Sequence, residues 1–173
     1  MKKLFAPWRS NYTTGTAHKN DGTETEHECG FCTQLAENND PKYFIFRRFK
    51  HTALMLNRYP YNAGHLLIIT LDHTAKLPDL SKEARAELQE LTSHSVTILE
   101  KTLEPAGMNV GLNLGKAAGA GMPAHLHVHV LPRWLGDTNF LPALGKTRII
   151  SFDLTQVYEK LKPHVDALPE KLF

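Results

Sequence analysis

Three short hydrophobic runs come first along the chain, and each predicts a β-strand. They span residues 43–49, 52–59 and 65–71, and they are rich in aromatic, aliphatic and β-branched side chains. A tight connection around Lys50 and His51 separates the first two runs. The turn residues of "YPYNAG" separate the second run from the third. The pattern therefore predicts three consecutive strands.

A helical pattern follows over residues 82–104. Asp79 and Ser81 are candidate N-caps in front of it, and Pro105 ends it because proline cannot continue a helix. Its apolar and small residues recur at helical spacing and form one stripe: Leu88, Leu91, Ser95, Ile98 and Thr102, flanked by Ala84, Leu99 and Leu103. We expect one long amphipathic helix here.

The second half of the chain repeats both kinds of pattern. Residues 108–114 and 125–134 alternate as strands, with a glycine-rich loop between them, and residues 153–165 read as an amphipathic C-terminal helix. Strands grouped before and after a single helix are typical of an α+β fold with a mainly antiparallel sheet. We therefore expect about five strands, one long helix and a C-terminal helix.

Length and composition limit the classes of protein to consider. The 173 residues suit a single domain, which we place at 29–173, after a polar N-terminal arm of residues 1–28. A formal net charge of +2 is too small to favour a nucleic-acid or membrane surface as partner. The apolar runs are also too short to cross a membrane. We expect a cytoplasmic protein.

Three histidines alternate with apolar residues in the last predicted strand. Residues two apart share a face of a strand, so His125, His127 and His129 line one face. The other face carries apolar side chains suited to a core: Leu126, Val128 and Val130. Neutral imidazoles in such a row can share a zinc ion. Alternatively, one imidazole is a nucleophile and its neighbours assist proton transfer.

The loop before this strand favours the second interpretation. Gly115, Gly119 and Gly121 let the backbone approach a ligand closely, and successive N–H groups can bind an anion. A flexible hairpin connection explains the glycines equally well, and no P-loop pattern is present. Beside a row of histidines, however, an anion-binding loop indicates phosphoryl or nucleotidyl transfer rather than metal-dependent hydrolysis.

The chain contains two cysteines, Cys29 and Cys32, in "ECGFC". Two cysteines do not make a disulfide framework. The spacing suits half of a tetrahedral zinc site or a redox pair, and two buried thiols are the simplest alternative.

Together these motifs resemble the histidine triad (HIT) superfamily of nucleotide-binding proteins. "HLHVHVL" is similar to the family signature, and "LNRYPYNAGHLLII", "DHTAKLPDL", "GLNLGKAAGAG" and "HVLPRWLGDTNF" follow the family's order. The resemblance covers roughly residues 29–140. It implies that His127 is the nucleophile and that His129 contacts the transferring phosphate and the leaving oxygen. It further implies that His125 orients the nucleophile and that His65 supports it.

The resemblance also implies a nucleotide-binding set: Asn57, Asn113, Gly119, Gly121, Met122 and Trp134. One departure matters here, because many relatives carry Gly-Gln-Ser just before the triad where this chain has "AGAGMPAH". Backbone N–H groups of the loop would therefore have to replace side-chain contacts to phosphate. Trp134 would stack on a base or ribose, or else pack at the end of its strand.

In zinc-bearing relatives the cysteine pair is completed by two histidines, which correspond here to His73 and His125. Such a site would be structural, since four protein ligands leave no position for water. The chemistry itself would need no cofactor.

The function implied is that of a homodimeric enzyme that processes dinucleoside polyphosphates such as diadenosine tetraphosphate through a nucleotidyl-histidine intermediate. Release to water makes it a hydrolase, and release to inorganic phosphate makes it a phosphorylase. A nucleoside phosphoramidase is a further alternative. Two alternatives outside this mechanism are a metallohydrolase with zinc on the triad and a nucleotide sensor without catalysis.

Overall fold

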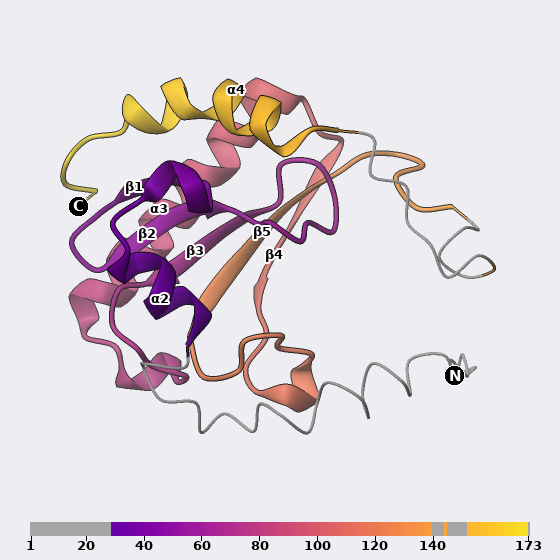
Figure 1. Cartoon of the computed structure of the whole chain (residues 1–173). Coiled ribbons are helices and arrows are strands. Elements are labelled where there is room, and N and C mark those ends of the chain that lie inside the picture. The colour runs from indigo at the N-terminus through magenta and orange to yellow at the C-terminus, as the bar shows by residue number, and fades with distance from the viewer. Residues whose placement is uncertain (1–28, 140–143, 145–151, 173) are drawn as a thin grey trace.

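The computed structural model describes residues 29–139, 144 and 152–172 (Figure 1). The predicted N-terminal arm of residues 1–28 lies outside this part of the chain, so the domain boundary stays a prediction. Five strands form one sheet in the order β1-β2-β3-β5-β4, and every neighbouring pair is antiparallel. The strands are β1 Ile45–Arg48, β2 Thr52–Leu56, β3 Leu66–Thr70, β4 Gly107–Leu112 and β5 His127–Arg133. The predicted α+β class is confirmed.

The helices are α2 Gly30–Ala36, α3 Lys82–Leu103 and α4 Leu154–Asp166. Three short 3-10 helices accompany them, η2 Asp40–Tyr43, η3 Leu77–Asp79 and η4 Lys116–Ala118. Ser81 is the N-cap of α3, since its hydroxyl accepts a hydrogen bond from the N–H of Ala84 at 3.0 Å, whereas Asp79 ends η3. The long helix and the C-terminal helix match the sequence prediction, but α2 was not expected.

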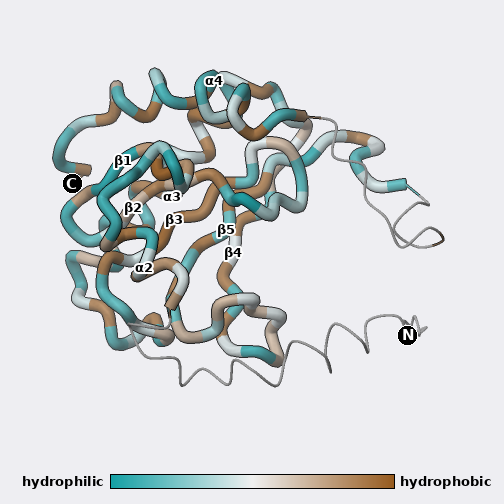
Figure 2. The backbone as a smooth tube through the Cα atoms, viewed as in Figure 1, coloured by the Kyte–Doolittle hydropathy of each residue, from teal (hydrophilic) through white to brown (hydrophobic). Residues whose placement is uncertain are grey.

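The two faces of the sheet are covered by different helices (Figure 1). On one face α3 and α4 pack against alternate strand residues and form the larger core. On the other face α2 covers a smaller cluster that includes Cys29, Phe31, Met55 and Leu67. Figure 2 shows β3 hydrophobic along its length, whereas β5 alternates between hydrophobic and hydrophilic residues. The imidazoles of β5 therefore lie on the face that α2 only partly covers.

β5 begins two residues later than the sequence pattern suggests. The N–H of Leu126 donates to the carbonyl oxygen of Thr74 at 2.6 Å, and regular pairing with β3 starts at His127 opposite Ile69. His125 is therefore held just before the strand, where its ring can reach the cysteines.

β4 forms one edge of the sheet, and Val110 on it is 49% exposed. The homodimer implied by the family resemblance stays a prediction. None of the helices in the described residues combines the length and apolarity needed to span a bilayer.

Gly64 closes the turn between β2 and β3 directly against α3. Its φ is +70°, a left-handed conformation, and a Cβ there would lie 2.4 Å from Leu103 Cδ1 and 3.2 Å from Leu99 Cδ2. The turn that carries His65 into the sheet thus requires glycine both for its backbone and for the approach of α3.

We expect Gly64→Ala to lower the free energy of unfolding by about 3 kcal/mol, because left-handed backbone strain adds to overpacking against the leucines of α3. Gly136→Ala is the matched control, since Gly136 has a φ of +80° and nothing within 4 Å of its Cβ position. Gly136→Ala should lower the free energy of unfolding only by the cost of left-handed backbone strain, about 1 kcal/mol. Denaturant unfolding measures both, and equal losses would contradict the packing explanation.

Candidate active site and metal centre

The sheet register places the histidines of β5 on one face. His127 pairs with Ile69 and His129 pairs with Leu67 across β3, while Val128 and Val130 point into the opposite core. His127 is buried and His129 is half-buried. Their ring centroids are 4.9 Å apart. The predicted row of imidazoles therefore exists, although its first member precedes the strand.

The hydrogen bond of His127 determines which nitrogen can attack. Its Nδ1 lies 2.8 Å from the carbonyl oxygen of His125. A carbonyl oxygen only accepts, so Nδ1 carries the proton and Nε2 of the neutral ring keeps its lone pair. Burial lowers the pKa of His127, and the bond to His125 opposes this in part. The neutral, nucleophilic form is thus favoured.

A second chain of hydrogen bonds orients His129. The backbone N–H of Tyr61 donates to Nδ1 of His65 at 3.2 Å, and the Asn57 amide also lies 3.2 Å from this atom. The proton of neutral His65 is therefore on Nε2, which lies 2.9 Å from Nδ1 of His129. It follows that neutral His129 carries its own proton on Nε2.

The N–H at His129 Nε2 points away from His65 and can donate a hydrogen bond to a bound molecule. Asn113 Nδ2 lies 3.4 Å from this nitrogen, and only with the amide turned over would its oxygen accept from the N–H. Burial lowers the pKa of His65 to about 3, with repulsion from His129 and His127 as smaller causes. Burial, followed by repulsion from His127, lowers the pKa of His129 to about 4. Both rings are neutral at pH 7.

Room for a ligand lies beside His129. Gly111 of β4 pairs directly with His129, and a Cβ at Gly111 would meet nothing within 4 Å. The N–H of Gly119 donates to the carbonyl oxygen of Lys116 at 2.9 Å, so this predicted phosphate donor is already engaged. The predicted phosphate contacts from the loop backbone are then those of Gly121 and Met122, and they stay predictions.

Trp134 follows the last residue of β5, five residues beyond His129, roughly 17 Å along an extended strand. The structure therefore does not place it next to the imidazoles, and its stacking role stays a prediction. The backbone N–H of Trp134 donates a hydrogen bond to Asp137 Oδ2 at 3.1 Å. Asp137 also pairs with Arg133 at 2.7 Å and accepts from the Asn62 amide at 2.8 Å. Arg133 holds the pKa of Asp137 far below its usual range.

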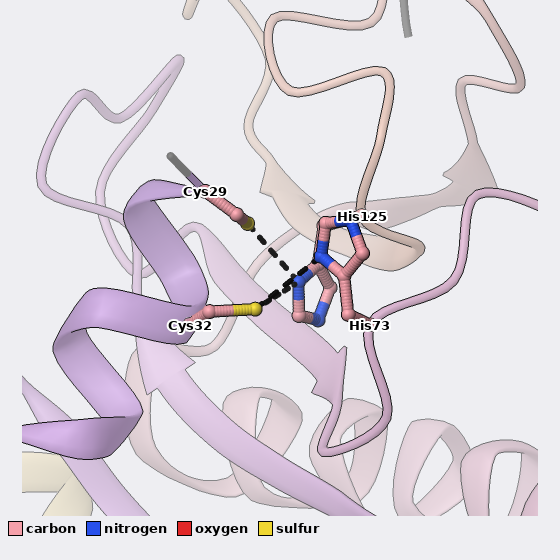
Figure 3. A group of neighbouring side chains, drawn as sticks. All are labelled: Cys29, Cys32, His73 and His125. Atoms are coloured by element: carbon pink, nitrogen blue, oxygen red, sulfur yellow. Dashed lines mark hydrogen bonds between the residues drawn. The ribbon is translucent and has the colours of Figure 1, made fainter. Parts of the chain in front are cut away.

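Figure 3 shows a second group of side chains next to the triad, formed by Cys29, Cys32, His73 and His125. Cys29 caps α2, Cys32 lies within it, and the two histidines come from loops facing it. Nδ1 of His125 lies 3.2 Å from Cys29 Sγ and 3.5 Å from Cys32 Sγ. Nδ1 of His73 lies 3.3 Å from Cys32 Sγ. The four predicted zinc ligands are thus brought together.

The chemistry of these donors fits zinc. All four ligand atoms lie within 4.8 Å of one another, and tetrahedral zinc with thiolate and imidazole ligands needs sulfur-to-nitrogen separations of about 3.5 Å. His125 Nε2 lies 2.8 Å from the carbonyl oxygen of Thr70 and donates to it, so its Nδ1 presents a lone pair to the cysteines.

The triad itself does not form a zinc site. Its three imidazoles use their Nδ1 atoms toward different partners, the cysteines, a carbonyl oxygen and His65. Within residues 29–139, 144 and 152–172, the cysteine-histidine group is the metal-binding candidate.

Phe31 of α2 joins the two sites. Its ring meets that of His125 edge-on at 5.4 Å and that of His127 at 5.3 Å. Sequence reasoning did not identify Phe31, although it lies between the two cysteines. It also did not identify Tyr61, whose position four residues before His65 was the available signal.

The HIT domain family model matches residues 38–134. The chain belongs to the HIT family. A protein of Mycobacterium tuberculosis named AP-4-A phosphorylase is 35% identical over 150 residues, which cover 87% of this chain and 77% of that protein.

Two further proteins are similar to this chain. The asymmetrical bis(5'-nucleosyl)-tetraphosphatase of Schizosaccharomyces pombe is 31% identical over 93 residues, 54% of this chain and 50% of that protein. The crystal structure of a Zn-bound histidine triad family protein from Mycobacterium smegmatis matches with a TM-score of 0.66 at 23% identity. The match covers 82% of this chain and 96% of the Mycobacterium smegmatis chain, and it shows that the two share a fold.

We expect His65→Gln to reduce the loss of stability on acidification. Because the pKa of folded His65 is about 3 against an unfolded value of 6.5, the unfolded chain takes up this proton first as the pH falls. From pH 7 to pH 5 this contributes about 2 kcal/mol of lost stability, which the variant should not show. Denaturant unfolding at the two pH values measures it.

His94→Gln on α3, a histidine outside these contacts, should keep the pH dependence of the unsubstituted protein. If His65→Gln keeps it as well, the buried neutral state assigned to His65 is wrong.

Proposed function

We propose that this HIT protein transfers a nucleotidyl group from a dinucleoside polyphosphate, such as diadenosine tetraphosphate, through a covalent intermediate on His127. The bond from His127 Nδ1 to the carbonyl oxygen of His125 carries this proposal, because it leaves Nε2 as the attacking atom. The relatives named AP-4-A phosphorylase and bis(5'-nucleosyl)-tetraphosphatase support the choice of substrate.

In the first step His127 Nε2 forms a bond to the α-phosphorus, and the bond from that phosphorus to the bridging oxygen breaks. The neutral ring of His129 keeps its proton and donates a hydrogen bond from Nε2 to the departing oxygen, so ATP leaves from diadenosine tetraphosphate as an anion and an adenylyl group stays on His127. The positive charge on the substituted ring is stabilised by the bond from Nδ1 to His125.

In the second step we propose inorganic phosphate as the acceptor, which attacks the adenylyl phosphorus and releases ADP and His127. The Mycobacterium tuberculosis relative, of which the match spans 77%, is named a phosphorylase. This name favours inorganic phosphate over water as the acceptor. Water as acceptor would release AMP instead.

We also propose a structural zinc ion on Cys29, Cys32, His73 and His125. Bound there, zinc would be closed to substrate by four protein ligands and would supply rigidity rather than chemistry. The described residues then have separate tasks: His125 joins the metal site to the nucleophile through its carbonyl oxygen, and Phe31 packs against both histidines.

Incubation with diadenosine tetraphosphate, with and without inorganic phosphate, tests the function. We expect ADP and ATP in the presence of phosphate, and a much slower release of AMP and ATP without it, read by chromatography. AMP and ATP at equal rates under both conditions would identify a hydrolase, and no turnover of any adenylylated substrate would contradict the proposal.

The matched variant is His127→Ala, which should lower kcat by at least about 10³-fold while nucleotide binding stays measurable. A rate close to that of the unsubstituted protein would exclude His127 as the nucleophile.

Cys32→Ala tests the zinc site independently of activity. The unsubstituted protein should hold about one zinc per chain by elemental analysis, and the variant should hold almost none. Loss of zinc should lower the free energy of unfolding by about 4 kcal/mol, the contribution of a ligand present at a thousand times its dissociation constant. The control is His164→Gln, which replaces an exposed histidine on α4 and should keep both the zinc content and the free energy of unfolding. Equal zinc contents in Cys32→Ala and the control would contradict the site.

A further inference from the structure

We propose that Tyr61 is a positioning residue for His129: its ring covers the outer side of the His65–His129 pair and holds His129 in the orientation that donates a hydrogen bond to the leaving oxygen. This inference rests on the proposed function and assigns a task to a residue outside the triad.

The ring of Tyr61 lies against both histidines. Its centroid is 4.7 Å from that of His65 and 5.9 Å from that of His129, and it is nearly parallel to His129, at 20°. The ring of His129 also meets that of His127, with centroids 4.9 Å apart. His129 therefore has both the proposed nucleophile and the tyrosine as ring neighbours. Tyr61 is 51% exposed, so its outer face is open to solvent while its inner face covers the pair.

The backbone holds Tyr61 in this place. The backbone N–H of Tyr61 donates to His65 Nδ1 at 3.2 Å. This is the first bond of the hydrogen-bond chain that continues from His65 to His129. In the same turn the Asn62 amide donates to Asp137 Oδ2 at 2.8 Å and to the carbonyl oxygen of Pro132 at 3.3 Å. The turn that presents the ring is thus fixed to the end of β5, the strand that carries His129.

The groups that face His129 explain what the ring does. Among the described residues, they are His127 on the same strand, His65 before β3, Asn113 after β4 and the Tyr61 ring. His65 and Asn113 lie within hydrogen-bond distance of its two nitrogens, and His127 repels its charged form. The tyrosine supplies apolar surface, which excludes water and limits rotation of the imidazole. Without it His129 gains water contacts and its proton is less well aligned with the departing oxygen.

The experiment compares Tyr61→Ala with Tyr61→Phe, which keeps the ring. Tyr59→Ala is the matched control, because Tyr59 lies two residues earlier in the same turn and is 83% exposed. Two substrates are used, the phenyl and the 4-nitrophenyl esters of AMP. The phenolate is the more basic leaving group, so its departure depends more on the hydrogen bond that His129 Nε2 donates.

Tyr61→Ala should lower kcat for the phenyl ester by about 10-fold or more, with at most about a 3-fold change for the nitrophenyl ester and in either KM. Tyr61→Phe and Tyr59→Ala should stay within about 3-fold on both substrates. Equal losses on the two esters would show a merely structural role and would overturn the proposal.

Histidine NMR titration gives a readout that does not depend on turnover. The pKa of His129, held near 4 chiefly by burial, should rise toward its ordinary value in Tyr61→Ala and stay low in Tyr61→Phe. An unchanged His129 titration in Tyr61→Ala would overturn the proposal. Failure of the proposed function has a different signature, since the unsubstituted protein would then turn over no ester while the titration shift remained.

Discussion

The hydrogen bond from His127 Nδ1 to the carbonyl oxygen of His125 is the interaction on which the active site depends. It fixes the tautomer of His127, the proposed nucleophile, and it does so through the backbone of a residue whose side chain faces the cysteines. Any change that moves His125 therefore moves the acceptor of His127. For this reason the metal candidate and the catalytic candidate, although chemically separate, share one short segment of chain.

Burial of the imidazoles is tolerated because each one is hydrogen-bonded as a neutral ring. His125 donates to Thr70, His127 donates to His125, and His65 donates to His129. Burial removes water from around the charged form of His65, His127 and His129, and this lowers the pKa of all three groups. The same contacts thus hold these rings neutral, which is the form that the proposed nucleophile needs.

Much of this arrangement could be predicted from the sequence, because alternation along a strand and periodicity along a helix are local properties. The two faces of β5 and the stripe of α3 follow from them directly. The helix α2 could not be predicted in this way, since its seven residues bury only Phe31 and hold their place through contacts with loops far along the chain. The direction of the proton chain depends on the Tyr61 N–H, a backbone group that no residue pattern identifies.

The position of β5 between two unlike neighbours explains why the site opens toward β4. On the β3 side His129 lies opposite Leu67, a buried residue of the smaller core, whereas on the β4 side it lies opposite Gly111, where a Cβ would meet no atom of the described residues within 4 Å. The phosphate chain of the proposed substrate would therefore approach over β4 rather than over β3. Because Asn113 and the glycine-rich loop continue from β4, the strand that leaves space beside His129 would also lead the backbone toward that phosphate chain. Sheet order, rather than the triad alone, would thus set the direction of the proposed attack.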